Sequence, residues 1–412
     1  MVSTKSLSIE FRDDDERECD VALLDLPANA DWVLIACWVD RTCMRNALAY
    51  RLGRDFGRWA PALRWVEVSI NGEYRGLYQL VEAIRTSKHR LDLNRPAATA
   101  KLGDITGDYV FRREHAGKHS GSPTVVYDWI SPTRDADGYR HIFTYHYPRH
   151  DDLTDQQRRY LHGFVAKFET QMYAAVGSVS DVANIIDMAT WVDYALVTEY
   201  ANEVDGWMKS VYFVKPSDRR DARLQLTPLW DYNLAFGQLK HRGGHKTGVW
   251  QHKAANRHHL GCTPQLPVPP GCDRCSRGLE YDNLPFVPQW ASQLFADPQF
   301  RAALGCRWQE MRAGVLSDAV VQAKLRRWHA RLAPAMRRHF GRWPELLEHR
   351  EVRHPAGRTP ELAAVSPLAD LVGPHGRDSA DLFAEEVAWM AEWIRRRGAW
   401  LDDHMPACVR TR

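Results

Sequence analysis

Apolar side chains recur along the chain with two different periods, and these periods predict its elements. Residues 7–11 alternate apolar and polar side chains, as a strand with one buried face requires. Residues 40–57 repeat apolar side chains at every fourth position, which predicts a helix that Asp40 caps and Gly57 ends. The first region of the chain therefore mixes a strand with a helix.

A second alternating pattern follows this helix and predicts a β-hairpin. Residues 66–70 alternate on one side of the dipeptide Asn71-Gly72, and apolar residues alternate again on its other side up to Glu82. An Asn-Gly pair favours a tight type I′ turn because both residues tolerate a positive φ angle. We therefore expect two antiparallel strands joined at this dipeptide.

The middle of the chain predicts two helices followed by two strands. Thr154 and Gln157 have the spacing of a capping box, at the start of a helix that extends to Gly177. A second helix is expected from about residue 181 through the sequence WVDYALVTEY. The strands VYFVK and RLQLTPLW come next, and the second of them ends at Asp231.

The rest of the chain is helical except for one irregular stretch. Residues 287–403 have helical periodicity, whereas residues 238–286 are rich in Gly, Pro, His and Cys and predict an inserted loop. We therefore predict an α+β fold with a helical C-terminal region. Its expected divisions are residues 1–115, residues 116–345 with the insertion, and a C-terminal extension over residues 346–412.

Charge and composition restrict the possible partners. The net charge of +3, from 55 basic and 52 acidic residues, gives no reason to expect nucleic acid as a partner. No run of 18 apolar residues occurs, so the sequence predicts no membrane span. The first residues contain no apolar signal region, which by itself predicts a chain that is not exported.

Two aspartates have the arrangement that phosphoryl transfer uses. Asp205 lies in a loop after a predicted helix, and Asp231 follows two predicted strands. In kinases one aspartate accepts or orients the proton of the attacking hydroxyl, and another holds the metal ion on the nucleotide phosphates. The amide oxygen of Asn233 is a further hard ligand for such an ion. The alternative is that both aspartates simply form turns.

Four segments resemble the CotH family, which is named for a spore-coat protein and regarded as a group of atypical, secreted or surface-associated protein kinases. They occur in the family's order over about residues 5–345 and read WVLIACWVDRTCMRNALAYRLG, NGEYRGLYQLVEAI, NEVDGWMKSVYFVK and LWDYNLAFG. The resemblance implies a two-lobed, protein-kinase-like fold whose lobes are the first two divisions of the chain. It also implies binding of ATP with Mg²⁺ or Mn²⁺, and transfer of the γ-phosphoryl group to Ser or Thr of a protein substrate.

The resemblance also implies roles for individual residues. Asp205 matches the catalytic-loop aspartate, Asp231 matches the metal-binding aspartate, and Asn233 occupies the position of a second metal ligand. Glu82 ends the hairpin where a kinase hinge would begin, so its neighbourhood is expected to meet the adenine.

Two basic residues are further candidates for contacts with the nucleotide. Lys5 is expected on the first strand, facing the presumed cleft, and is a candidate for the phosphate-contacting lysine, although a solvated N-terminal lysine is the alternative. Arg45 belongs to an Arg-Asn pair, with Asn46, that matches the family. This pair either orients phosphate or braces the interface between the lobes.

Two departures from the family weaken the enzymatic interpretation. Family members usually carry an Arg-Gly-x-Ser segment before the first strand, and this chain has only VSTKSLS. The expectation is that the sequence is a fragment or a truncated product, or that its phosphate-covering strands are degenerate. Ser210 also occupies the place of a metal-binding asparagine. A catalytically inactive pseudokinase or a surface adhesin on the same scaffold is therefore the alternative function.

The cysteines leave the compartment open. Cys262, Cys272 and Cys275 lie in the irregular stretch together with several histidines. Their spacing does not match a standard zinc module, so a disulfide among them is the preferred interpretation, with zinc as the alternative.

Overall fold

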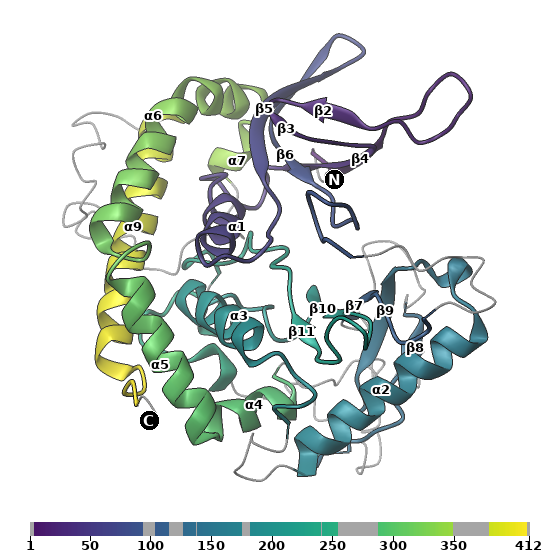
Figure 1. The fold of residues 1–412 in the computed structure, drawn as a ribbon. Helices are drawn as coiled ribbons and strands as arrows, with labels where there is room; N and C mark the ends of the chain where they lie inside the picture. Colours follow the sequence, from purple (N-terminus) through teal and green to yellow (C-terminus); the bar gives the residue numbers. More distant parts are fainter. Residues whose placement is uncertain are drawn as a thin grey trace, which may run out of the picture.

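The computed structural model describes most of the chain, and everything below refers to that part. The described residues are 4–93, 104–114, 127–136, 138–174, 182–239, 241–253, 287–348 and 379–409. They form a mixed α+β fold, as the sequence predicts, in which two antiparallel sheets each have helices packed beside them. A pair of long helices extends along the outer side of the molecule past both sheets (Figure 1).

The first sheet contains the predicted hairpin. Its strands, in spatial order, are β1 (Leu7–Glu10), β4 (Asp31–Ala36), β6 (Glu73–Glu82) and β5 (Leu63–Ile70), and a separate pair consists of β2 (Val21–Leu23) and β3 (Leu26–Asn29). Asn71 and Gly72 have φ angles of 51° and 81°. Positive φ at both central residues is the type I′ geometry, so the predicted turn is confirmed.

The helix predicted in the first region is α1 (Arg45–Asp55), which lies beneath this sheet and is mostly buried. It begins later than the sequence indicates. The residue at its N-cap position is Met44, so the prediction that Asp40 occupies that position is wrong. The Asp40 carboxylate nevertheless accepts the N–H of Arg45, the first residue of α1, at 2.8 Å. The predicted stop at Gly57 is confirmed by a φ angle of 82°.

The second sheet lies below the first in Figure 1 and carries the other predicted strand pair. Its strands, in spatial order, are β11 (Gln225–Leu226), β10 (Val211–Lys215), β7 (Tyr109–Glu114), β9 (Ile142–Tyr147) and β8 (Trp129–Ile130). The strand β7 therefore belongs to this sheet although it precedes residue 115. The division of the chain at residue 115 stays a prediction.

The last strand is much shorter than RLQLTPLW suggests. Only Gln225 and Leu226 pair with β10, so the prediction that the strand extends to Asp231 is wrong. Pro228 explains the early end, because a proline has no N–H to donate to a neighbouring strand. Asp231 instead lies in an irregular segment after the strand.

Two helices pack beside the second sheet. In α2 (Asp155–Ala174) the capping box is confirmed: Gln157 N–H donates to Thr154 Oγ1 at 3.3 Å, and Thr154 N–H donates to Gln157 Oε1 at 2.9 Å. The helix α3 begins at Met188, so the predicted start near residue 181 is wrong. Because α3 is buried on nearly all sides, no polar face marks where it begins.

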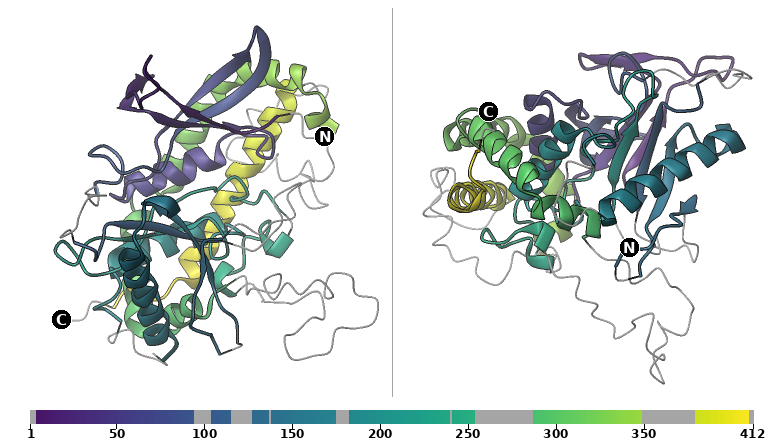
Figure 2. Two further views of the ribbon diagram at one scale, coloured as in Figure 1. Left: turned by 90° about the vertical axis from the view of Figure 1, so that its right-hand side faces the viewer. Right: turned by 60° about the horizontal axis from the view of Figure 1, so that its bottom comes forward.

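The C-terminal region is helical wherever it is described, as predicted. Its helices are α4 (Gln289–Ala296), α5 (Pro298–Arg312), α6 (Asp318–Arg342), α7 (Glu345–Glu348) and α9 (Ser379–His404). The helix α6 packs on β6, and α9 packs on both α6 and α3. Figures 1 and 2 show this pair spanning the height of the molecule, so it ties the first sheet to the helices of the second.

One glycine of the hairpin allows α6 to come close. Leu77 N–H donates to His339 Nδ1 at 3.0 Å, and Trp343 Nε1 donates to the carbonyl of Arg75 at 2.9 Å. A Cβ atom on Gly76 would lie 2.5 Å from the His339 ring, and its φ angle is 101°. The packing of α6 on β6 therefore requires glycine at this position.

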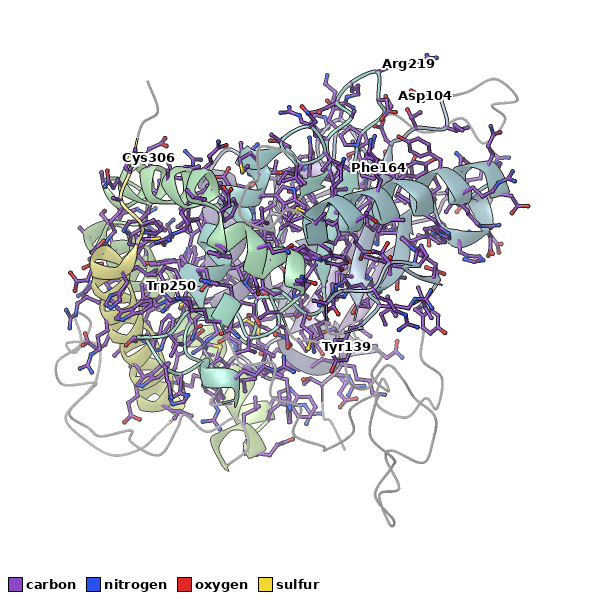
Figure 3. The ribbon with its side chains drawn as sticks, turned by 90° about the horizontal axis from the view of Figure 1, so that it is seen from below. Asp104, Tyr139, Phe164, Arg219, Trp250 and Cys306 are labelled. Carbon is purple, nitrogen blue, oxygen red and sulfur yellow. A yellow bond between two sulfur atoms is a disulfide. The ribbon has the colours of Figure 1, made fainter. Side chains whose placement is uncertain are left out.

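Two disulfides are present among the described residues. Cys306 on α5 (labelled in Figure 3) is bonded to Cys408, just beyond α9. Cys37 is bonded to Cys43 ahead of α1. The predicted disulfide among Cys262, Cys272 and Cys275 lies outside the described residues. Within the described ranges, no helix combines the length and apolarity that a membrane crossing requires.

Glu169, a buried residue on α2, should make the stability of the protein depend on pH. Burial raises the pKa of Glu169 to about 8, and a hydrogen bond from the Ser131 hydroxyl only partly opposes this. Between pH 4.5, its ordinary pKa, and pH 8, the unfolded chain loses this proton while the folded chain keeps it, so stability falls as pH rises.

We expect Glu169→Gln to remove this part of the pH dependence. At pH 8 the free energy of unfolding of the variant should exceed that of the parent by at least about 1 kcal/mol. The reason is that each unit by which folding raises the pKa of Glu169 corresponds to about 1.4 kcal/mol. At pH 4, where the carboxyl is protonated in both states, the two proteins should be similar. Urea unfolding at several pH values tests this, and parallel stability profiles would contradict it.

Candidate functional site

Asp205 lies in a tight turn directly after α3, the helix that lies below α1 in Figure 1. Asn202 ends α3 in a left-handed conformation with a φ angle of 47°. Its amide nitrogen donates to the carbonyls of Gly243, Gly244 and Lys246 at 3.0–3.1 Å. These hydrogen bonds fix the turn to residues 241–253, which follow the segment that contains Asp231.

The Asp205 carboxylate is paired with two cations. Its Oδ1 accepts from Arg242 at 2.8 Å, and its Oδ2 lies 3.0 Å from the Lys209 ammonium. The side chain of Asp205 is 12% exposed, so part of the carboxylate reaches solvent. A carboxylate has about four lone-pair directions, so two ion pairs leave it able to accept another hydrogen bond.

Asp231 lies in an unusual backbone conformation beside this turn. Its φ angle is 63°, in the left-handed region that few non-glycine residues adopt. Its N–H donates to the Tyr50 hydroxyl of α1 at 3.1 Å, and the Ser210 side chain hydrogen-bonds its carboxylate. Burial raises the pKa of this carboxyl; Lys209 opposes the rise, and Asp205 adds to it.

A third carboxyl group, that of Glu203, interacts electrostatically with both aspartates. It is 1% exposed, and its Oε1 accepts the N–H of Asp205 at 3.1 Å. Burial raises its pKa well above the ordinary value, and the charges of Asp205 and Asp231 raise it further. Its other oxygen, Oε2, has no hydrogen-bond partner among the described residues. Three mutually repelling acidic groups are therefore gathered around Lys209.

Backbone strain is concentrated at the same place. Ten described non-glycine residues have positive φ angles, and half of them belong to this site or to segments that contact it: Asn202, Ser210, Asp231, Phe236 and Arg242. Such conformations cost of order 1–3 kcal/mol each and persist only where the surrounding structure enforces them. Their clustering marks this as the candidate functional site.

The donor set here fits a divalent cation that is shared with phosphates. Asp231 offers a carboxylate, and Glu203 Oε2 is a buried oxygen without a partner among the described residues. No group of three or more His, Cys, Asp or Glu side chains within the described ranges is arranged to hold a metal ion by itself. Mg²⁺ commonly binds one or two carboxylates and completes its shell with water and phosphate oxygens, so the residues present fit that mode.

The other candidate residues lie in different surroundings. Asn233 is partly buried two residues after Asp231, and Lys5 is exposed ahead of the edge strand β1. Glu82 is 3% exposed at the end of β6, where its carboxylate accepts the N–H of Ala62 at 2.8 Å. Arg45 is completely buried and hydrogen-bonded to Asp40 and to the carbonyl of Ala235. The proposed contacts of these residues with metal, phosphate or adenine stay predictions.

Sequence reasoning missed three residues that determine the charge of the site. Glu203 and Lys209 belong to the quoted segment around Asp205, and Arg242 lies in the stretch assigned to an insertion. Glu203 lies two positions before Asp205 and Lys209 four positions after it, but the segment is a turn, where such spacings do not indicate which side chains meet. Only the turn after α3 and its contact with residues 241–253 bring them together.

Comparisons with known proteins agree with the motifs. A family model described as CotH kinase protein matches residues 2–401, which is nearly the whole chain. No curated protein matches the chain closely enough to count as a relative.

Proposed function

Because the chain belongs to the CotH kinase family, we propose that it transfers the γ-phosphoryl group of ATP to a Ser or Thr hydroxyl of a protein substrate. The observation that supports this best is that Asp205 and Asp231, from two separate segments, both act on one cation: the Lys209 ammonium lies 3.0 Å from Asp205, and the charge of Asp231 also raises the pKa of Lys209. Kinases need these two carboxylate roles and a way to offset the charge of the phosphates.

Asp205 would act on the acceptor hydroxyl. Its carboxylate is held in place by Arg242 and Lys209, and it keeps acceptor capacity for one more hydrogen bond. That geometry suits a group that orients a nucleophile, because the carboxylate cannot rotate away when the hydroxyl arrives.

Lys209 would stabilise negative charge on the transferring group. Burial works against its charged form, but Asp205, Asp231 and Glu203 outweigh this and raise its pKa, so it is an ammonium at neutral pH. With its side chain 39% exposed and held 3.0 Å from the Asp205 carboxylate, this cation can offset the charge of an arriving phosphate.

Asp231, with Asn233, would hold a divalent cation on the phosphates, and this ion would neutralise phosphate charge when it is bound. Tyr50 and Ser210 fix Asp231 from two sides. The left-handed backbone at Asp231 then fits a residue that serves a ligand at the expense of local stability.

The wider assignment follows from the same proposal. The two sheets would be the cores of the two lobes of a kinase-like fold, with a boundary before β7, which precedes residue 115 but pairs within the second sheet. Disulfides persist in oxidising compartments, so Cys37–Cys43 and Cys306–Cys408 favour a secreted or surface location.

Binding of ATP with and without metal tests the proposal. We expect calorimetry to show clear binding of ATP with Mn²⁺ and at least about 10-fold weaker binding in EDTA, since the phosphates and Asp231 repel each other unless a cation lies between them. Radiolabelled ATP should then label the protein itself or an added acceptor protein. Equal affinity in EDTA, with no transfer, would favour the pseudokinase or adhesin alternative.

A further inference from the structure

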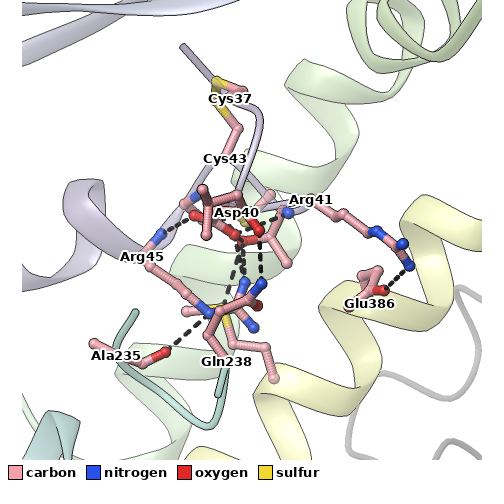
Figure 4. Close-up of polar contacts among 12 residues, drawn as sticks. Cys37, Asp40, Arg41, Cys43, Arg45, Ala235, Gln238 and Glu386 are labelled. Atoms are coloured by element: carbon pink, nitrogen blue, oxygen red, sulfur yellow. Dashed lines mark hydrogen bonds and ion pairs between the residues drawn. A yellow bond between two sulfur atoms is a disulfide. The ribbon is translucent and has the colours of Figure 1, made fainter. Parts of the chain in front are cut away.

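The loop before α1 is a small closed unit. Cys37 and Cys43 are bonded to each other and are 3% and 1% exposed. Between them, Asp40 accepts the N–H and the hydroxyl of Thr42 at 3.0 and 2.6 Å. The disulfide and these hydrogen bonds hold the Asp40 carboxylate in one position, as Figure 4 shows.

That carboxylate fixes a buried arginine. Arg45 Nη1 is ion-paired with Asp40 Oδ1, and the two side chains are 0% and 7% exposed. A buried cation without its partner costs several kcal/mol, so Asp40 determines where the guanidinium lies. Arg45 is therefore oriented by the loop.

The same arginine reaches the segment that carries Asp231. Arg45 Nε donates to the carbonyl of Ala235 at 2.9 Å, and Gln238 Nε2 donates to the carbonyl of Val39 at 2.6 Å (Figure 4). Two hydrogen bonds thus connect the disulfide loop with residues 235–238. Phe236 N–H also donates to the carbonyl of Ala201 at 2.7 Å, which fixes the segment to the end of α3.

We propose that Arg45 is a positioning residue for Asp231, oriented by Asp40 and the Cys37–Cys43 disulfide, and that affinity for metal-bound nucleotide depends on this chain of contacts. The part of this proposal that concerns nucleotide affinity rests on the proposed function. The effect of Arg45 on the conformation of residues 231–238 does not. A backbone held at a φ angle of 63° needs fixed neighbours on both sides. Tyr50 supplies one of these contacts and the bond from Arg45 to Ala235 supplies the other.

The first test removes the ion pair without leaving a charge buried alone. Asp40→Asn/Arg45→Met keeps a side-chain oxygen that can accept the N–H of residue 45 at the start of α1 and puts an unbranched apolar side chain in place of the arginine stem. Hydrogen exchange should accelerate by about 10-fold or more at the amides of residues 231–238, as expected for the loss of a hydrogen bond to a charged group. The amides of α3 should keep their rates, because a local positioning role does not lower global stability.

The matched control is Arg41→Met/Glu386→Gln. Arg41 lies in the same loop but pairs with Glu386 of α9 at 3.5 Å, so this variant should leave exchange at residues 231–238 unchanged. Calorimetry should show about 10-fold weaker binding of Mn²⁺–ATP for the first variant, by the same hydrogen-bond argument, and parent affinity for the control.

The second test removes the disulfide that closes the loop before α1. Cys37→Ala/Cys43→Ala should also accelerate exchange at residues 231–238 and weaken Mn²⁺–ATP binding. Cys306→Ala/Cys408→Ala, which removes the disulfide at the end of α9, should do neither. Unchanged exchange at residues 231–238 in both loop variants would overturn the proposal.

Nucleotide binding separates this proposal from the proposed function. A parent that binds no Mn²⁺–ATP would contradict the kinase assignment, and hydrogen exchange alone would then decide whether Arg45 positions the segment. A parent that binds, together with loop variants that exchange faster but bind equally well, would also overturn the proposal.

Discussion

Asp205→Asn should abolish most phosphoryl transfer while sparing nucleotide binding. The carboxylate would act on the acceptor hydroxyl, and loss of a positioned base typically costs about 10²–10⁴ in rate. The phosphates and their cation would contact Asp231 and Lys209 instead, so the dissociation constant of Mn²⁺–ATP should change by less than about 3-fold, or roughly 0.7 kcal/mol. Single-turnover rates and calorimetry on the same protein measure the two effects.

The variant also weakens two ion pairs, so a control for stability is needed. Asp193 on α3 offers one: it is 4% exposed and binds Arg58 at 2.6 Å and Arg307 at 2.7 Å. Asp193→Asn should lower the melting temperature at least as much as Asp205→Asn does, because breaking a buried pair is costly. Its transfer rate should stay near that of the parent. If both variants lose transfer equally, Asp205 acts only through the fold.

Asp231→Asn should weaken metal-dependent binding and at the same time stabilise the protein without ligand. Alterations near a bound metal commonly cost 10–100-fold in affinity, so loss of a direct ligand should raise the dissociation constant of Mn²⁺–ATP by about 100-fold. Burial raises the pKa of Asp231, which means that its charged form destabilises the fold above its ordinary pKa of 3.8. Asparagine removes that charge, so the melting temperature without ligand should rise.

The opposite signs of these two effects are the diagnostic result. A turn-forming aspartate with a purely structural role would lose stability on substitution and would leave ATP affinity the same. In EDTA, Asp231→Asn should bind ATP at least as well as the parent does, since asparagine removes the carboxylate that repels the phosphates when no cation lies between them. A lower melting temperature combined with unchanged Mn²⁺–ATP affinity would contradict the assignment of Asp231 to the metal.

The sequence predicted those elements whose signals are local. The turn at Asn71-Gly72 and the capping box of Thr154 and Gln157 depend on residues a few positions apart, and both occur as predicted. The start of α3 was predicted incorrectly for the opposite reason, whereas the length of β11 was predicted incorrectly although its signal, Pro228, is local. A helix buried on nearly all sides has no polar face to mark its start, and the end of the strand depended on Pro228.

The candidate site divides in the same way. Motif order was enough to single out Asp205 and Asp231, because their chemistry and the segments around them can be read one after the other along the chain. Their surroundings could not be read in this way. The partners that set their charge and conformation are Glu203, Lys209, Arg242, Tyr50 and Ser210.

The sequence by itself therefore determined the family and the α+β class and singled out the two aspartates as candidates, since each depends on local patterns or on motifs in order. The tertiary structure alone decided what Arg45 contacts. Its bond to Ala235 joins residues 190 positions apart, and its partner Asp40 is held by a disulfide. Contacts over such distances follow from the packing of α1 against the Asp231 segment. They leave no periodic trace, because hydrophobic patterns record only which face of an element is buried and not what that face meets.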